Sequence, residues 1–344
     1  MLTADRLRVS VVTVTYNGRA HLEECLGSLL AQSRPADEIL VIDNASSDGS
    51  AELIRERFPG VRLLVQPRNL GFAAACNLAA RAATSEAVAF VNNDARFDRQ
   101  WLQNLMAPLE ADPALSAVQS LILLYAEPEL INTSATALNF LGVGWCNDYR
   151  RPLAEARSGE IPVLSGAAFA IRRQLYLDAG GFDDDYFMYH EDVDLSWRLR
   201  LMGGSLRLAA SSLVFHKYQF GRAGQKNYLL ERNRLMTLLK NYRLPTLVLV
   251  APALLAMELG VCLLALRQGW LGGKLRGYGD VLRSLPALRQ KRRAVHRLRQ
   301  LSDRALTRFW VGSIDFEEIK SPLVSVGSVT LHAYWRAVRP LLRW

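Results

Sequence analysis

The residues best suited to do chemistry follow directly after a short apolar run. Residues 87–91, with the sequence AVAFV, are followed by Asn92, Asn93 and Asp94. Five apolar residues without alternation predict a strand buried on both faces, with the polar triplet at its carboxyl end. Ligands of open α/β sheets bind at that end. Asp94 could therefore hold a divalent cation and, through it, a diphosphate, although Asn-Asn-Asp is also ordinary turn chemistry.

A second group of candidate residues lies in the segment 182–202, FDDDYFMYHEDVDLSWRLRLM. Six acidic residues fall between Asp183 and Asp194, interleaved with aromatic ones. Some of them would occupy the first turn of a helix, where the helix dipole alone could explain carboxylates. Like charges beside aromatic rings are nevertheless costly unless a cation or a catalytic role compensates them. This pattern favours a functional role for Glu191 or Asp192.

Two further polar residues end predicted strands. Asp43 follows a strand at 38–42, where its carboxylate could accept the N–H of a uracil or thymine base, or serve as an ordinary turn residue. His216 follows a strand at 206–215, and an imidazole there could complete an oxygen-rich metal site. A single histidine is more often structural, so both interpretations stay open.

The elements that must position these residues alternate between strand and helix along the first hundred residues. Short loops between them imply right-handed parallel crossovers and a nucleotide-type α/β sheet. The loop after the first strand, TYNG, lacks GxGxxG, and no Walker loop occurs, so we expect recognition by side chains and a metal. The predicted strands are 9–15, 38–42, 61–65 and 87–91, and the predicted helices are about 20–32, 50–57 and 72–83.

The elements after Asp94 are a helix at about 99–110 and a strand near 117–123. Residues 132–157 are less regular, which predicts a mobile loop beside the site. A strand at 163–171 contains the small residues Ser-Gly-Ala-Ala, which allow a ligand or another backbone to approach closely. A basic amphipathic helix is predicted at 225–241.

Composition bounds the class of protein. Half of the 344 residues are hydrophobic and 22% are charged, which predicts one large globular domain with an appendage. The four cysteines form no CxxC pair and are typical of a reducing compartment rather than a disulfide framework or zinc site. The first residues show no signal-peptide pattern, so a cytoplasmic location is expected.

The order of these motifs resembles the family 2 glycosyltransferases of the GT-A fold, and most closely their bacterial rhamnosyltransferase-like branch. The resemblance implies an α/β fold with a mostly parallel sheet flanked by helices over residues 1–241. It also implies an inverting transfer from a nucleotide-diphosphate sugar, with rhamnose from dTDP-rhamnose as the best match. The matching blocks are VVTVTYNG (11–18), VIDNASSDGS (41–50), RNLGFAAACN (68–77), FVNNDA (90–95), SGAAFAIRR (165–173), YHEDVDLSWRLR (189–200), VFHK (214–217) and ERNRLMTLLKN (231–241).

The resemblance also implies roles for individual residues. Asp192 would be the base, with Glu191 beside it, because inversion needs a base opposite the leaving group. Asp94 and His216 would hold Mg²⁺ or Mn²⁺ against the departing diphosphate. Many relatives carry Asp-x-Asp where this chain has Asn92, an amide that binds cations weakly. Donor-binding roles would fall to Thr15, Tyr16, Asn17, Asp43, Asn69, Gly71, Asn93 and Asp94, and acceptor-binding roles to Gly166, Ala167, Glu191 and Trp197.

The C-terminal region, 242–344, is apolar at first and then basic. Residues 267–344 carry a net charge of +11, although the whole chain carries +9. Residues 244–266 are about long enough to cross a bilayer, but Pro245, Pro252, Glu258 and the positive flanks favour a re-entrant or interfacial helix. A true span and a buried helix of a soluble homo-oligomer are the alternatives.

The stretch 283–299 predicts a basic helix after Pro286, suited either to anionic lipid headgroups or simply to solvent. No nucleic-acid motif occurs, so we expect no nucleic-acid partner. We therefore expect a peripheral or monotopic enzyme at the cytoplasmic membrane face that acts on a lipid-linked or polysaccharide acceptor.

A nucleotidyltransferase would need a basic signature loop, which residues 15–20 lack. A non-catalytic membrane scaffold is the other alternative, hinted at only by Asn92.

Overall fold

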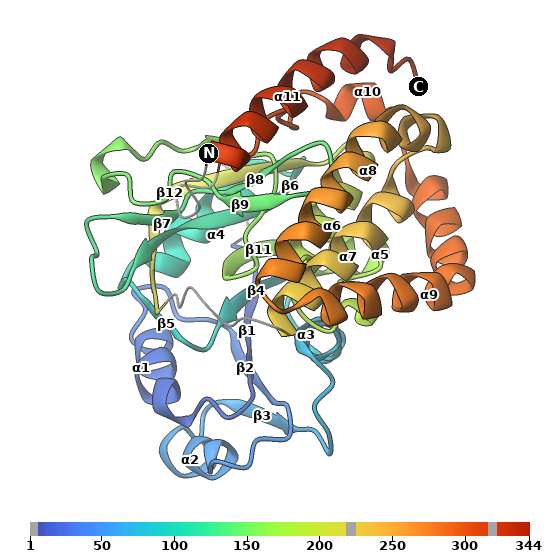
Figure 1. The fold of residues 1–344 in the computed structure, drawn as a ribbon. Coiled ribbons are helices and arrows are strands. Elements are labelled where there is room, and N and C mark those ends of the chain that lie inside the picture. Colours follow the sequence, from blue (N-terminus) through green and yellow to red (C-terminus); the bar gives the residue numbers. More distant parts are fainter. Residues whose placement is uncertain (1–5, 218–224, 316–321) are drawn as a thin grey trace. The chain divides into compact units, whose positions relative to one another are not determined.

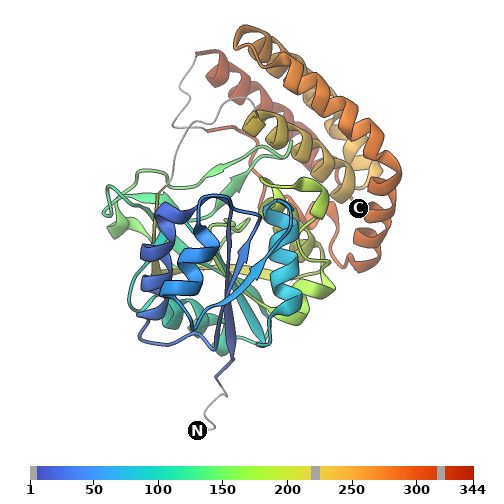
Figure 2. The same ribbon diagram turned by 90° about the horizontal axis from the view of Figure 1, so that it is seen from below.

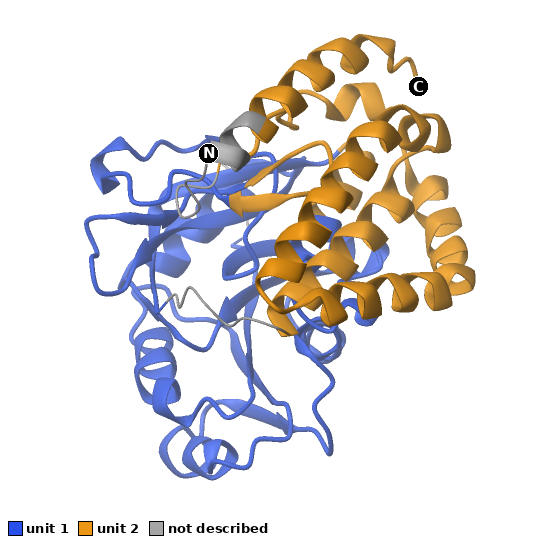
Figure 3. Cartoon of the chain, in the orientation of Figure 1, with its two compact units in different colours: residues 1–136, 146–195, 204–218 blue, residues 137–145, 196–203, 219–344 orange. Residues whose placement is uncertain are grey.

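The chain folds as two units whose segments alternate along the sequence (Figure 3). The computed structural model describes residues 6–217, 225–315 and 322–344. Unit 1 comprises residues 1–136, 146–195 and 204–218, and unit 2 comprises residues 137–145, 196–203 and 219–344. The domain boundary after residue 241 stays a prediction.

A mixed sheet of ten strands runs through the described part of the chain (Figure 1). Its main order is β10-β12-β6-β11-β4-β1-β2-β3, with β5 paired to β12 and β7 to β6. Neighbours β4, β1, β2 and β3 are parallel, whereas β11 is antiparallel to both β4 and β6. The strands are β1 Val9–Thr15, β2 Glu38–Asp43, β3 Arg62–Val65, β4 Ala87–Asn92, β5 Ala95–Phe97, β6 Leu115–Leu124, β7 Ile131–Thr133, β10 Gly159–Glu160, β11 Ala168–Arg172 and β12 Ser205–His216.

The direction of the chain across the sheet reverses between β3 and β4, because β4 pairs with the other side of β1. Helices therefore cover both faces, and Figure 2 shows α1 and α2 on one side of these strands and α3 on the other. Such a switch point opens a crevice at the carboxyl ends of β1 and β4. The helices of this part are α1 Arg19–Leu30, α2 Ser50–Arg57, α3 Phe72–Ala82, α4 Trp101–Ala111, α5 Arg173–Asp178 and α6 Glu191–Leu201, with 3₁₀ turns η1 Leu153–Glu155 and η2 Asp184–Tyr186.

The predicted α/β sheet flanked by helices is confirmed, and three predictions about single elements are wrong, two of them between residues 132 and 171. The strand expected at 163–171 begins at Ala168, because the backbone N–H of Gly166 is bonded to a side chain rather than to a neighbouring strand. The loop expected at 132–157 contains short strands, β8 Thr136–Leu138 and β9 Gly144–Cys146, that pair with each other. Short strands of three residues leave too weak a periodicity to be recognised in a sequence.

Helices make up the C-terminal part of unit 2. The basic helix expected after Pro286 begins much earlier, at Leu271, and continues through the proline. Proline removes one helical hydrogen bond, so a long helix normally bends there. Packing along its neighbours keeps this helix continuous, and Figure 1 shows it changing direction along its length. The helices are α7 Gln225–Asn241, α8 Leu244–Arg267, α9 Leu271–Leu298, α10 Asp303–Leu306 and α11 Pro322–Val338, followed by η3 Arg339–Leu341.

A cluster of charged side chains ties α8 to α7 and α9. Glu258, in the middle of α8, pairs with Arg234 and lies 2.6 Å from Lys274 Nζ. Both cations also contact Glu231 of α7, and both are almost completely buried. Helix α8 has the length and hydropathy to cross a membrane, which by itself is weak evidence for a span. These ion pairs hold one face of α8 to α7 and α9, while only 11% of its most apolar window is buried.

Candidate active site

The carboxyl ends of β1 and β4 meet at the switch point of the sheet. Asn93 follows β4, and its side-chain amide donates a hydrogen bond to the hydroxyl of Thr15 at 3.0 Å. Gly18 lies against both groups, since a Cβ at that position would come within 2.2 Å of the Asn93 amide nitrogen. The structure therefore brings two predicted donor-binding residues together, and a side chain at position 18 would have to displace them.

Asp94 and His216, the two predicted metal ligands, lie side by side. Strand β12 ends at His216, whose Nε2 is 3.1 Å from Asp94 Oδ1. Asn92 Nδ2 lies 3.2 Å from the same imidazole nitrogen, and Asn132 Oδ1 lies 3.3 Å from Nδ1. Although burial opposes ionisation, the hydrogen bond from His216 lowers the pKa of Asp94. The result is an ionised carboxylate beside a histidine held by two amides.

The loops after β2 and β3 form a second polar cluster. Asp43 is buried, and its Oδ1 accepts a hydrogen bond from the N–H of Ser46. Its Oδ2 is buried with no hydrogen-bond partner among the described residues. A buried carboxylate oxygen without a partner is costly, so this atom is suited to accept a donor from a ligand.

The neighbouring loop is fixed by an asparagine side chain. Asn44 donates to Asn69 Oδ1 at 2.8 Å and accepts from the N–H of Leu70 at 2.8 Å. Asn69 Oδ1 in turn accepts from the N–H of Gly71. These bonds hold the predicted donor-binding residues Asn69 and Gly71 close to the end of β2.

The loop after β1 carries the remaining predicted donor-binding residues. Asn17 has a positive φ of 52° and accepts a hydrogen bond from the N–H of Ser47 at 2.8 Å. Tyr16 beside it is 53% exposed. An exposed aromatic ring at the carboxyl edge of a sheet is available to stack on a base.

Asp192, the predicted base, is held by backbone groups. Its Oδ2 accepts from the N–H of Gly166 at 2.8 Å, and its Oδ1 accepts from the N–H of Val193. A Cβ at Gly166 would lie 3.5 Å from Asp192 Oδ2, an ordinary contact distance, so this residue lies directly against the carboxylate. The neighbouring residue, Ala167, accepts from the N–H of Asn92 at 2.9 Å. This chain of bonds connects Asp192 with Asn92 at the end of β4, two residues before Asp94.

Glu191 and Asp192 share an environment that disfavours their ionised forms. Glu191 is buried, and its Oε2 has no hydrogen-bond partner among the described residues. Burial, and then the charge of Asp192, raise the pKa of Glu191 well above its usual range. Burial also raises the pKa of Asp192, against the backbone hydrogen bonds that favour its ionised form. One carboxyl of the pair is therefore expected to keep its proton near neutral pH.

The segment before α6 has strained backbone. Phe187, Tyr189 and His190 all have φ between 64° and 72°, which is uncommon for residues with side chains. Phe187 contacts Gly71 so closely that a Cβ there would lie 2.5 Å from the Phe187 carbonyl oxygen. The donor-side loop and the loop before the carboxyl pair are thus packed against each other.

The other acidic residues of this segment have structural partners. Asp184 accepts from the side chain of Asn77 at 2.5 Å, and Asp183 accepts from the N–H of Asp185. Asn77 also donates to the carbonyl of Phe182. Asp184 therefore anchors the segment to α3 through Asn77, whereas Glu191 and Asp192 form the pair at the beginning of α6.

Known proteins resemble this chain across the segments just described. A family model described as Glycosyl transferase family 2 matches residues 10–179. The chain is also 32% identical, over 234 residues, to the N-acetylglucosaminyl-diphospho-decaprenol L-rhamnosyltransferase of Mycobacterium tuberculosis (strain ATCC 25618 / H37Rv), covering 60% of this chain and 75% of that relative. The chain belongs to glycosyl transferase family 2. It is a glycosyltransferase, as its sequence motifs predicted.

Solved structures show the same fold at lower identity. This glycosyltransferase matches GalNAc-T7, crystallised with UDP, GalNAc and Mn²⁺, with a TM-score of 0.57 and 19% identity over 68% of this chain and 48% of that one. It matches the mannosyltransferase PcManGT of Pyrobaculum calidifontis, in complex with GDP-Man and Mn²⁺, with a TM-score of 0.50 and 22% identity over 85% of both chains. These similarities support the GT-A fold.

The glycosyltransferase offers few protein ligands to a cation. No group of three or more His, Cys, Asp or Glu side chains suited to a metal occurs in the described ranges. Asp94 and His216 supply one oxygen and one nitrogen, which Mg²⁺ or Mn²⁺ accepts when substrate phosphates complete the shell. The residues present fit a cation that is bound together with its nucleotide.

Sequence reasoning did not single out Asn44 or Asn132, and the structure places Trp197 away from solvent. Asn132 lies in β7, a strand too short to predict, and Asn44 has the composition of an ordinary turn residue. Trp197 is fully buried and packs edge-on against Tyr242 and near Trp310. A side chain buried in this way presents no surface to an acceptor.

Proposed function

We propose that this family 2 enzyme transfers a hexose, with inversion, from a nucleotide-diphosphate sugar to a lipid-linked or polysaccharide acceptor of the cell surface. The name of the M. tuberculosis relative, which specifies a diphospho-decaprenol acceptor and L-rhamnose, supports this acceptor class and makes dTDP-rhamnose the first donor to test. The observation that carries the proposal is the bonded path from Asp192 through Gly166 and Ala167 to Asn92 at the end of β4, two residues before Asp94. These bonds fix the proposed base, Asp192, relative to the end of β4, where we propose that the diphosphate binds.

The proposed reaction is a single displacement. The acceptor hydroxyl oxygen forms a bond to the anomeric carbon while the bond from that carbon to the diphosphate oxygen breaks. Asp192 takes the hydroxyl proton, and the N–H groups of Gly166 and Val193 keep its carboxylate oriented. Glu191, which keeps its own proton more readily, adds no second negative charge beside the base. A bound Mg²⁺ or Mn²⁺ on Asp94 and His216 would neutralise charge on the leaving diphosphate.

Donor recognition is proposed to use the cluster after β1, β2 and β3. The buried Oδ2 of Asp43 would accept the N–H of a uracil or thymine ring, and Tyr16 would lie against the base. The remaining donor contacts are assigned to Thr15, Asn17, Asn69, Gly71 and Asn93, and the acceptor is assigned to the side of Gly166, Ala167 and Glu191.

The test is a panel of dTDP-rhamnose, UDP-galactose, UDP-glucose and GDP-mannose, assayed for binding and hydrolysis with and without Mg²⁺ or Mn²⁺. We expect selective, cation-dependent binding of one uracil or thymine donor, and weaker binding in the Asp43→Asn variant. Asp48→Asn is the matched control, because Asp48 accepts from the N–H groups of Arg19 and Ser50 and so caps local structure. A folded protein that binds none of the four donors would contradict the proposal.

We also propose that the C-terminal region holds the enzyme at the cytoplasmic face of the membrane, as a peripheral or monotopic protein. The net charge of +11 after residue 266 and the ion pairs that hold α8 against α7 and α9 support this arrangement over a span. A homo-oligomer remains a further expectation, to be tested by the mass of the purified protein.

A further inference from the structure

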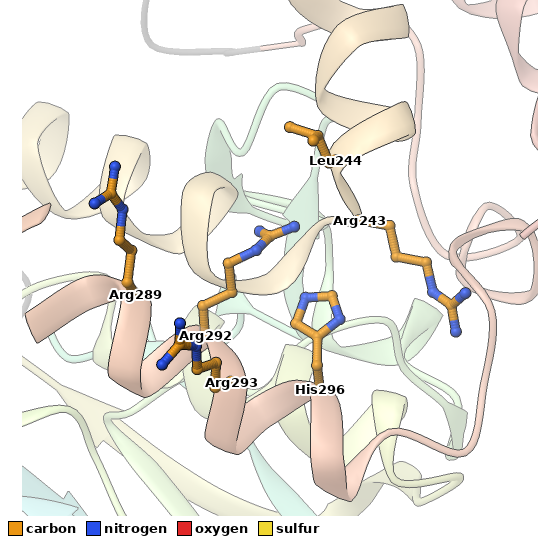
Figure 4. A pocket seen from close by; sticks show the side chains of 6 residues that line it. All are labelled: Arg243, Leu244, Arg289, Arg292, Arg293 and His296. Carbon is orange, nitrogen blue, oxygen red and sulfur yellow. The ribbon is translucent and has the colours of Figure 1, made fainter. Parts of the chain in front are cut away.

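Unit 2 contains a strongly basic pocket of about 410 Å³. Figure 4 shows two of its residues at the beginning of α8 and four on α9, with the imidazole of His296 between the side chains of Arg292 and Arg243 in that view. A pocket of this size and composition has the charge and donors to surround a phosphate group. Its lining residues are Arg243, Leu244, Arg289, Arg292, Arg293 and His296.

The carboxylate of Asp303 acts on Arg292 and His296 of this pocket without forming an ion pair with the pocket's arginines. No carboxylate in the described ranges forms an ion pair with any of its four arginines. The buried carboxylate of Asp303 is already engaged, since it accepts from Arg299 at 2.6 Å and from the hydroxyl of Thr246. By contrast Arg276 and Arg283, also on α9, both pair with Asp280. Arg292 donates to the backbone carbonyl of Leu239, but none of the four guanidinium groups has a carboxylate partner in the described ranges, so they repel one another around the cavity until an anion enters.

His296 adds a hydrogen-bonding group to the same cavity. Its Nε2 is buried and has no hydrogen-bond partner among the described residues. Burial, followed by the charges of Arg299 and Arg292, lowers the pKa of His296 to about 4, so the ring is neutral at pH 7. A neutral imidazole can still donate one hydrogen bond to a phosphate oxygen.

An exposed apolar stripe begins at the pocket and continues along α8. Leu244 lines the pocket and is also the first residue of the stripe. At 3.6 residues per turn, the stripe occupies about 100° of the helix surface. Its members, which are 62% to 68% exposed, are Leu244, Val248, Leu255, Leu259, Leu263 and Leu266.

We propose that the basic pocket binds the phosphate of an anionic membrane lipid while the leucine stripe of α8 lies among the acyl chains. This inference rests on the proposed membrane association of the C-terminal region. Charge complementarity and the continuity at Leu244 select a lipid as the occupant. A soluble phosphate would leave the stripe uncovered, and a second copy of the chain would leave the arginines unpaired.

The test is co-sedimentation with vesicles of phosphatidylcholine alone or with one quarter phosphatidylglycerol. The double variant Arg289→Gln/Arg293→Gln should bind the anionic vesicles at least about tenfold more weakly than the unchanged protein. The matched control is Arg276→Gln/Arg283→Gln, which removes the same charge from α9 outside the pocket and should change binding less than about twofold. All four side chains are exposed, so folding should be unaffected, which thermal unfolding checks.

Further measurements distinguish a membrane lipid from a soluble phosphate or a second copy of the chain as the occupant. Leu255→Ser/Leu259→Ser should weaken vesicle binding at unchanged charge, and millimolar glycerol 3-phosphate should not displace the protein. Three results would each overturn the proposal. They are equal losses of vesicle binding in the two arginine variants, displacement of the protein by glycerol 3-phosphate, and no preference for anionic vesicles. So would a dimer that the leucine substitutions dissociate, since the stripe would then belong to a second copy. Donor hydrolysis in solution does not depend on vesicles, so failure of this site is distinguishable from failure of the proposed reaction.

Discussion

Two largely buried glutamates, Glu191 in unit 1 and Glu231 in unit 2, differ in what surrounds them. Glu231 contacts Arg234 and Lys274, which lower its pKa to about 2 although burial opposes this. Glu191 lies beside Asp192, and burial together with that charge raises its pKa. Around Glu231 buried charge is neutralised by ion pairs between helices, whereas around Glu191 it is left uncompensated. Uncompensated ionisable groups are typical of functional sites.

The largest effect is expected at the uncompensated pair. Asp192→Asn should lower turnover by about a thousandfold, because the variant can no longer accept a proton, while the donor dissociation constant changes less than about twofold. Steady-state kinetics and calorimetry measure the two quantities. Asp178→Asn, at an exposed position on α5, is the control. Loss of donor binding, or retained turnover, would refute the role of the base.

The next effect concerns the stability of the folded protein when either glutamate is replaced. Glu231→Gln leaves two buried cations short of a partner and should lower the free energy of unfolding by about 3 kcal/mol at pH 7. Glu191→Gln resembles the protonated form already favoured and should cost less than about 1 kcal/mol. Urea denaturation compares the two variants. Equal losses of unfolding free energy in the two variants would show that the surroundings of Glu231 and Glu191 do not differ as described.

The pH dependence of the same two variants has opposite signs. Stability from Glu231 is present above its unfolded pKa near 4.5 and is lost as the pH falls toward 2, so the cost of Glu231→Gln should shrink at pH 3. Because the pKa of Glu191 is raised in the folded protein, the stability from its protonated form is present below its unfolded pKa near 4.5 and is lost as the pH rises, so the cost of Glu191→Gln should shrink as the pH rises.

The sequence alone predicted the alternating elements, the switch-point edge and the order of motifs, because long periodic segments and buried strands leave clear patterns. It could not divide the acidic segment into structural and uncompensated residues. That distinction depends on Asn77, which lies more than a hundred positions from Asp184 and meets it only in the folded chain. The burial of Trp197 was missed for the same reason, since Tyr242 and Trp310 are distant in sequence.

Removing the cation should weaken donor binding by a smaller factor than the loss of turnover expected for Asp192→Asn. Chelation with EDTA should weaken donor binding by about 10- to 100-fold. Asp94→Asn should have an effect of the same size, and EDTA should add little to it, because both changes remove the same interaction. Calorimetry on both proteins, with and without Mn²⁺, measures this. Additive losses would place the cation on other residues.

The smallest effect concerns the strained loop. Gly71→Ala should cost about 1–3 kcal/mol, because its φ is +82° and the new Cβ would meet the carbonyl of Phe187. Gly27→Ala in α1, where no atom lies within 4 Å of the added Cβ, should be neutral or stabilising. Thermal unfolding compares them. A neutral Gly71→Ala would show that the two loops are not packed as described.

The most direct test of the uncompensated pair is a carboxyl titration of the protein by NMR, with ¹³C-labelled glutamate and Glu191 assigned from the Glu191→Gln variant. We predict that Glu191 titrates well above 4.5, and that its pKa falls in the Asp192→Asn variant because one of the two causes of the shift is removed. Glu231 should titrate below 4.5 in the same spectra. A Glu191 that titrates at or below 4.5 would contradict the account of the active site.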